Sequence, residues 1–181
     1  MINRFRFIFS FLLFFFLFSC NNVKRKNIQQ SIESKQIEQY YHEGITNLAN
    51  QKYYLAIQSF NNVLELDSSY SKAFVSRGCT KAALKDFFGA IADFDKAISI
   101  NNYDTVAYYN RGVAFGRLKK YKYALNDFNT SIQLNKNYAD AYEARGMIKL
   151  LLHRKDGCLD LSKAGELGSI KAYSLIKQFC N

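Results

Sequence analysis

Apolar residues recur along this chain with a period of 34 residues. Three series share that step: Gly44, Gly78, Gly112 and Gly146; Ala56, Ala90 and Ala124; and Phe60, Phe94 and Phe128. The residues between them follow the spacing of amphipathic helices. A repeat of this length predicts pairs of antiparallel helices that stack into a solenoid.

The residue types at these positions indicate close packing inside each helix pair. Glycine on the first helix allows the second helix to approach, because glycine has no side chain. Alanine supplies a small partner on the second helix, and the phenylalanine four residues later fills the space beside it. A third aromatic series is expected to open each second helix, at Tyr53, Phe87 and Tyr121.

This pattern resembles the tetratricopeptide repeat family. That family places an aromatic residue or leucine early in the first helix, glycine or alanine four residues later, and aromatic, alanine and aromatic positions along the second helix. The early aromatic is present in all four units, as Tyr40, Phe74, Tyr108 and Tyr142. The resemblance covers about residues 37–172 and implies an all-α, right-handed solenoid of four helix-turn-helix units with a C-terminal capping helix.

The chain departs from the family because it contains no proline. The proline that usually ends the second helix is replaced by Ser68, Asn102 and Lys136. We therefore expect the turns rich in asparagine and serine to end those helices.

The predicted organisation is a leader, a tether, four repeats and a cap. Residues 1–19 form the leader, 20–36 the polar tether, 37–70, 71–104, 105–138 and 139–169 the units, and 170–181 the capping helix. The fourth unit is one residue shorter between its helices, which places Gly157 in the alanine position and Leu161 in the phenylalanine position. Terminal units of a solenoid are commonly atypical, because they face water on one side.

The leader is typical of an export signal. Arg4 and Arg6 precede an apolar run over residues 7–18, which is shorter than the about 20 residues that a permanent membrane helix needs. Ser19 and Cys20 then resemble the lipobox of bacterial lipoproteins, in which the cysteine carries the lipid (palmitate among its acyl chains), although Phe18 departs from the usual small or aliphatic residue. The resemblance implies anchoring in the bacterial cell envelope, with the inner and outer membranes both open. The alternatives are a signal-anchor helix, or a secretory signal with an incidental cysteine.

Charge argues against nucleic acid as a partner. The formal net charge is +10, but lysine and arginine are spread over the repeats instead of being concentrated on one helix. In the tether, Lys24, Arg25 and Lys26 would lie beside lipid headgroups if the chain is lipidated. A solvated linker is an equally good interpretation of that segment.

No catalytic or metal-binding pattern stands out in the sequence. His42 and His153 lie in different units, and neither has a cysteine or carboxylate at ligand spacing. We predict no enzyme activity, no cofactor, no metal and no small-molecule substrate. The series Arg77, Arg111 and Arg145 would suit phosphate binding, but we favour pairing with acidic residues of the second helices, because Asp93 and Asp127 recur at the same step.

Three cysteines lie beyond the lipobox. Cys79 is expected to fill a small apolar space on a first helix. Cys158 and Cys180 form a possible disulfide that would close a loop of about 22 residues at the C-terminal end. The alternative is two reduced cysteines buried in the cap.

First helices line the concave side of such a solenoid. In the resembling family, the inward positions correspond here to Tyr41, His42, Ile45, Ser76, Tyr109, Asn110, Val113, Arg117, Glu143 and Met147. Tyrosine offers a large contact area at low entropic cost, which suits a groove for a peptide or a partner's helix. The basic clamp for C-terminal carboxylates is not expected, because Tyr41 and Ile45 stand where the family's clamp uses lysine and asparagine.

The sequence thus predicts a non-catalytic, membrane-anchored scaffold whose partner is another protein or peptide. One alternative is a structural subunit of an envelope assembly that uses its edges and convex face. The other is an enzyme with an unrecognised site.

Overall fold

The computed structural model describes residues 29–180, and within that range all regular structure is helical. Residues 29–49 are helical, and eight labelled helices follow: α2 (Tyr53–Leu66), α3 (Ser71–Ala83), α4 (Phe87–Ile100), α5 (Thr105–Arg117), α6 (Tyr121–Leu134), α7 (Ala139–Leu151), α8 (Gly157–Glu166) and α9 (Ile170–Phe179). The fold is an all-α solenoid of helical repeats, as the sequence predicted. The leader, Cys20 and the basic residues of the tether lie outside the described residues.

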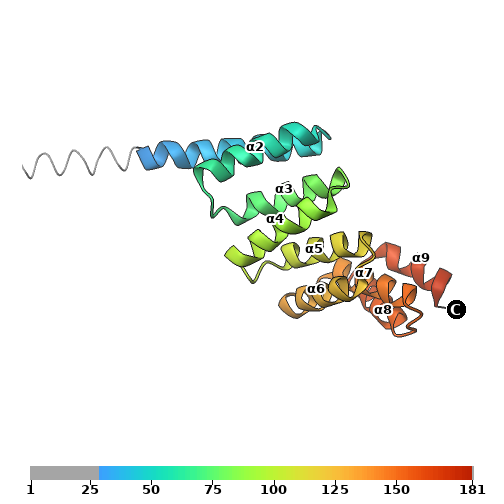
Figure 1. The fold of residues 1–181 in the computed structure, drawn as a ribbon. Coiled ribbons are helices and arrows are strands. Elements are labelled where there is room, and N and C mark those ends of the chain that lie inside the picture. The colour runs from blue at the N-terminus through green and yellow to red at the C-terminus, as the bar shows by residue number, and fades with distance from the viewer. Residues whose placement is uncertain (1–28, 181) are drawn as a thin grey trace, which may run out of the picture.

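The helices form antiparallel hairpins that stack one after another (Figure 1). The pairs α3 with α4, α5 with α6 and α7 with α8 make the hairpins, and α4 then packs on α5 and α6 on α7. The first helices also touch directly, α3 with α5 and α5 with α7. They form an inner layer, and the second helices α2, α4, α6 and α8 form an outer one.

The hairpins of units 1–3 are each held together by a phenylalanine that lies against a glycine. A Cβ atom added to Gly112 of α5 would lie 2.8 Å from Cε1 of Phe128 in α6. Gly78 and Phe94 repeat this arrangement one unit earlier, at 2.7 Å. The aromatic ring, not the small alanine expected opposite glycine, therefore lies closest to the glycine in these units.

In unit 4 the two helices pack against each other through a pair of glycines, Gly146 and Gly157. A Cβ on Gly157 would lie 2.5 Å from the carbonyl oxygen of Gly146, so the two backbones approach directly. Leu161 is fully buried behind them. The smaller side chain in the phenylalanine position is thus matched by a closer approach of the helices.

Asparagine and aspartate end the second helices, as predicted from the absence of proline. Asp67, Asn101 and Asn135 follow α2, α4 and α6 in extended conformation. Each side chain accepts a hydrogen bond from the backbone N–H two residues later, at 2.8, 3.1 and 3.0 Å. These local bonds fix the turn that proline would otherwise impose.

The first helix begins earlier than the first repeat, because residues 29–36 of the predicted tether are already helical. Most of these residues are exposed. None of the helices in residues 29–180 combines the length and the apolar character that crossing a membrane requires.

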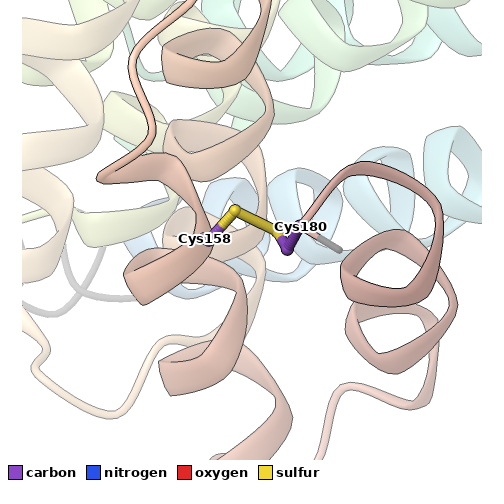
Figure 2. Close-up of a disulfide and its surroundings, with 2 residues drawn as sticks. All are labelled: Cys158 and Cys180. Atoms are coloured by element: carbon purple, nitrogen blue, oxygen red, sulfur yellow. A yellow bond between two sulfur atoms is a disulfide. The ribbon is translucent and has the colours of Figure 1, made fainter.

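The capping helix α9 is joined to α8 by a disulfide (Figure 2). The sequence left open whether Cys158 and Cys180 are bridged, and here their Cα atoms lie 5.8 Å apart with the sulfurs bonded. The hydroxyl of Tyr173 adds a hydrogen bond to the carbonyl oxygen of Gly165 at 3.1 Å. The C-terminal end of the solenoid is therefore closed both covalently and by side-chain packing.

Candidate functional site

The two inner-face tyrosines lie at junctions between hairpins. The hydroxyl of Tyr41 lies 3.2 Å from Oγ of Ser76, and its ring centroid lies 5.4 Å from that of Tyr70. Tyr109 repeats the arrangement, 5.1 Å from the ring of Tyr138 in an edge contact. Both tyrosines are half-buried, so they support the inner face more than they extend from it.

Burial raises the pKa of three tyrosine hydroxyls at these junctions. Desolvation raises the pKa of Tyr70 to about 12, and its hydrogen bond to Glu38 at 3.1 Å adds to that rise. Desolvation likewise raises the pKa of Tyr138 to about 12 and raises the pKa of Tyr109. These three hydroxyls therefore act as neutral hydrogen-bonding groups at neutral pH.

Glu143, predicted as a partner-binding residue, is instead engaged by the cap. Its carboxylate accepts a hydrogen bond from Ser169 Oγ at 2.8 Å and forms an ion pair with Lys171. Both donors lie at the start of α9, and the sequence alone did not place α9 there. A partner on the inner face would meet a neutralised carboxylate at this position.

Some of the other predicted groove residues are half-buried and support the inner face, and others are exposed and could contact a partner. Ile45, Val113 and Met147 are half-buried, and Val113 packs with Ala124 and Phe128. The amide of Asn110 donates to the carbonyl oxygen of Val106 at 2.9 Å. His42 and Arg117 are exposed.

The sequence analysis missed the residues at the second position of the four repeats. The family pattern directs this position inward, and all four residues are exposed: Glu38, Lys72, Val106 and Asp140. Val106 is 46% exposed and is the apolar member of the series. With His42 and Arg117, these residues make up the accessible chemistry of the inner face.

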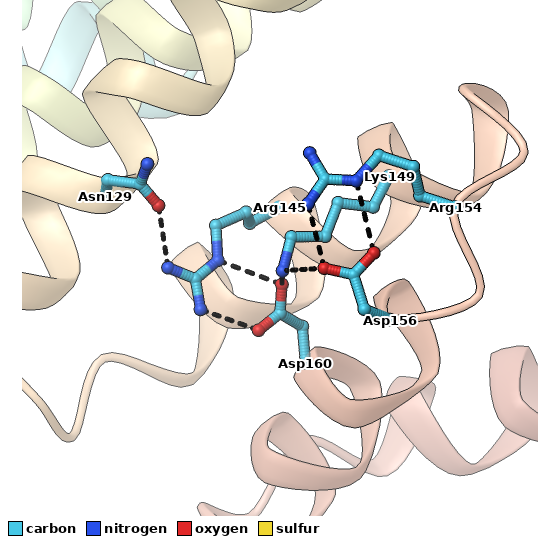
Figure 3. A network of polar contacts seen from close by, with 6 residues as sticks. All are labelled: Asn129, Arg145, Lys149, Arg154, Asp156 and Asp160. Carbon is cyan, nitrogen blue, oxygen red and sulfur yellow. Dashed lines mark hydrogen bonds and ion pairs between the residues drawn. The ribbon is translucent and has the colours of Figure 1, made fainter.

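The arginine series forms a ladder through the solenoid, and Figure 3 shows the rung at Arg145. Nε and Nη2 of Arg145 donate to Asp160 of α8 at 2.9 and 2.6 Å, and Nη1 donates to Asn129 of α6 at 2.7 Å. Arg145 thus ties its own hairpin to the preceding one. Lys149 adds ion pairs to Asp160 and Asp156, at 2.8 and 3.0 Å.

The same rung occurs in the two preceding units. Arg111 holds Asp127 and reaches Asp95 of the preceding unit, with contacts of 2.6–2.9 Å. Arg77 holds Asp93 and reaches Asn61 in the same way. Each guanidinium also lies over the early aromatic of its repeat, at 5.3–5.4 Å from the ring centroid.

These contacts confirm the structural interpretation of the arginines. Hydrogen bonds to Asp127 raise the pKa of Arg111, which stays protonated. Asp127 is almost fully buried, and a buried carboxylate needs such a partner. Because the carboxylates already engage the guanidinium groups, the series is not a phosphate-binding ladder.

The described residues contain no cluster of three or more histidine, cysteine or carboxylate side chains that would hold a metal ion. Cys79 is the unpaired cysteine in this range, and burial raises the pKa of its thiol to about 11. At neutral pH it is a thiol, which is a poor nucleophile.

One hairpin of the chain matches a protein-family model. Residues 105–138, which contain α5 and α6, match the family model of the tetratricopeptide repeat. This hairpin is therefore similar to a tetratricopeptide repeat. Units 1 and 2 repeat its glycine and its alanine, and units 2 and 4 repeat its glycine and its arginine–aspartate contact. No match was found among curated proteins.

Solved structures of the same fold cover most of the chain. A crystal structure of MamA matches with a TM-score of 0.69 at 22% identity, over 76% of this chain and 81% of MamA. The first tetratricopeptide repeat domain of Spaghetti (RPAP3), bound to the HSP90 peptide SRMEEVD, matches with a TM-score of 0.65 at 25% identity, over 66% and 95%. The Arabidopsis OM64 tetratricopeptide repeat domain gives 0.64 at 22%, over 66% and 98%.

Proposed function

We propose that this chain is a membrane-anchored, non-catalytic scaffold whose tetratricopeptide-repeat solenoid binds a peptide or a partner helix on its inner face. The observation that carries the proposal is the row of first helices in direct contact, α3 with α5 and α5 with α7, with exposed residues along it. Protein partners commonly bind solenoids on such extended concave surfaces. The similar RPAP3 domain is bound to a peptide.

The partner chemistry follows from the accessible residues. Val106 offers apolar contact in the middle of the row, and Arg117 and Asp140 offer opposite charges on neighbouring units. Val106 lies in the first turn of α5, Arg117 ends that helix and Asp140 lies in the first turn of α7, so an amphipathic segment that carries an apolar residue and both charges would match these residues. Tyr41 and Ile45 supply no basic clamp, so the proposed partner does not need a free C-terminal carboxylate.

The anchor is the second part of the proposal. Arg4 and Arg6, the apolar run and the Ser19-Cys20 pair follow the order of a lipoprotein signal. A lipid on Cys20 would hold the repeats at a bacterial membrane, through a short segment before the helix at residues 29–49. Intact mass spectrometry of the membrane-extracted protein tests this: we expect an N-terminus at Cys20 with added acyl mass. An unmodified N-terminus at Met1 would rule the anchor out.

A second candidate function is that of a structural subunit that uses its outer face. It is favoured by bulky side chains in the first turns of the outer helices, where Tyr54, Phe88 and Tyr123 are 79, 67 and 60% exposed. Such residues are more often found at interfaces than on solvated surfaces.

Variants on the two faces separate these functions. Val106→Asp with Arg117→Glu changes the inner face, and Tyr54→Ala with Phe88→Ala changes the outer face. The full-length protein is crosslinked in cells, purified from membranes and compared with both variants. We expect the inner-face variant to lose crosslinked partners and the outer-face variant to keep them; loss only in the outer-face variant would favour the structural subunit.

A further inference from the structure

The outer layer of the solenoid is interrupted at its last unit. Helices α2, α4 and α6 each have 14 residues and begin at the aromatic position, at Tyr53, Phe87 and Tyr121. Helix α8 has 10 residues and begins at Gly157, which is the alanine position of the repeat. Unit 4 therefore lacks the first helical turn that opens every preceding outer helix in the described residues.

A pocket lies beside α6, next to the turn that precedes this shortened helix. Its volume is about 590 Å³, and it is lined by Tyr121, Lys122, Tyr123, Leu125, Asn126, Asn129 and Leu152. All but Leu152 come from α6. We call this hollow the outer pocket; Leu152, which directly follows α7, closes its other side.

The lining of the outer pocket is mixed, with apolar surface and polar ends. Tyr123 is 60% exposed and Leu152 is 39% exposed, and Leu151 beside it is also exposed. Side chains of this size are normally covered when they line a hollow. The amide groups of Asn126 and Asn129 and the ammonium group of Lys122 provide hydrogen-bond donors around the apolar part.

Lys122 is the charged residue that lines the outer pocket. It is exposed, as are Lys119 in the turn before α6 and Lys155 in the turn before α8, and within residues 29–180 none of the three forms an ion pair with a carboxylate. The nearby carboxylate of Asp156 is already held by Lys149 and Arg154 (Figure 3). Acidic groups on a partner would therefore be attracted to this side of the molecule.

We propose that the outer pocket is a second interaction site, which accepts one turn of an acidic amphipathic helix from another protein. A bulky apolar side chain of that helix enters between Tyr123 and Leu152, and a carboxylate of the same turn pairs with Lys122. The bound turn takes the place that unit 4 leaves open in the outer layer. A helix in a groove is recognised through apolar anchors one turn apart, which fits a pocket built along one face of α6.

Two short synthetic peptides test this site on the full-length protein. Each peptide has about 12–15 residues and an alanine-rich helical sequence with one phenylalanine and one leucine a turn apart. The acidic peptide has glutamates beside the apolar pair, and the basic peptide has lysines at the same places. Fluorescence anisotropy of the labelled peptides gives the dissociation constants, and we expect the acidic peptide to bind at least about tenfold more tightly.

Matched variants locate the binding. Lys122→Glu and Leu152→Ala should each weaken the acidic peptide about tenfold, because they reverse the charge and remove the apolar wall. Lys96→Glu is the control for charge, since Lys96 is also exposed on an outer helix, and Tyr54→Ala is the control for aromatic surface. Both controls should bind the peptide normally.

Three outcomes would overturn the proposal. The first is equal affinity for the two peptides, and the second is loss of binding in Val106→Asp on the inner face instead of Lys122→Glu. The third is binding to vesicles containing anionic phospholipid that depends on Lys122 while neither peptide binds, because the basic surface would then face a membrane. None of these outcomes depends on the lipid anchor and only the second involves the inner face, so the proposed function is tested separately by mass spectrometry and by the crosslinking of the two face variants.

Discussion

At the scale of single residues, packing at one glycine per hairpin decides how closely the helices approach. Phe128 is almost completely buried, and its ring occupies the space where Gly112 has no side chain. Gly116 lies in the same helix, but a Cβ there would lie 3.5 Å from Cδ1 of Ile148, which is ordinary contact. The two glycines of α5 therefore have different roles, and only Gly112 belongs to the series that recurs every 34 residues.

Alanine at these two positions should change stability in opposite directions. Gly112→Ala forces the ring of Phe128 to move, and overpacking of this kind costs about 1–3 kcal/mol. Gly116→Ala should stabilise the protein by up to about 1 kcal/mol, because alanine favours the helix over glycine by that amount. Urea unfolding followed by circular dichroism measures both. A similar shift of the midpoint in the two variants would contradict this account of the hairpin.

At the scale of elements, the period of the sequence predicted the helices of units 1–3 because the same packing problem recurs there. The aromatic residues Tyr53, Phe87 and Tyr121 do open α2, α4 and α6. In unit 4 the sequence showed a deletion of one residue, but the helix loses a whole turn. Arg154 bonds Asp156 within the turn at 2.9 Å, and Asp156 also holds Lys149. Residues 154–156 form a turn with these contacts, and periodicity carries no information about where α8 begins.

The contacts of the inner-face side chains were predicted less well than the fold. A family pattern gives the direction of a side chain but not its neighbours in space. Glu143 does point toward a junction, yet the cap residues Ser169 and Lys171 bind it. Val106 is 46% exposed and was overlooked, although the family pattern directs the second position of each repeat inward.

The element whose stability depends most on one bond is α9. It has 10 residues, which is too short for a helix to be stable in isolation. Replacing Cys158 and Cys180 by serine should destabilise the protein by about 3 kcal/mol, from the entropy of a loop of about 22 residues. Hydrogen exchange should show the faster opening in α9, with α4 and α5 nearly unchanged. The control is Cys79→Ser, which leaves the bridge intact; uniform loss of protection along the chain would contradict a local role.

At the scale of the whole molecule, the arginine ladder has two defined ends. Glu43 stands where the ladder would require an arginine in unit 1, and Ser59 stands where it would require the aspartate. In the aligned position of α9, Ile176 replaces the arginine. A solenoid is stabilised by terms within repeats and between neighbours, so stability should be highest in the middle units that carry complete rungs.

Extending the ladder by one rung tests this view of the molecule. In the variant Glu43→Arg with Ser59→Asp, a guanidinium and a carboxylate should pair across the first hairpin and slow hydrogen exchange in α2. Ser59→Asp alone should speed that exchange, because Ser59 is buried and an unpaired carboxylate there would be costly. Glu43→Arg alone changes an exposed position and should have little effect. The coupling is read from the double-mutant cycle, and it should be favourable by about 1–3 kcal/mol. Purely additive effects of the two changes would show that the ladder does not link the helices, and that the hairpins are held by the phenylalanine packing alone.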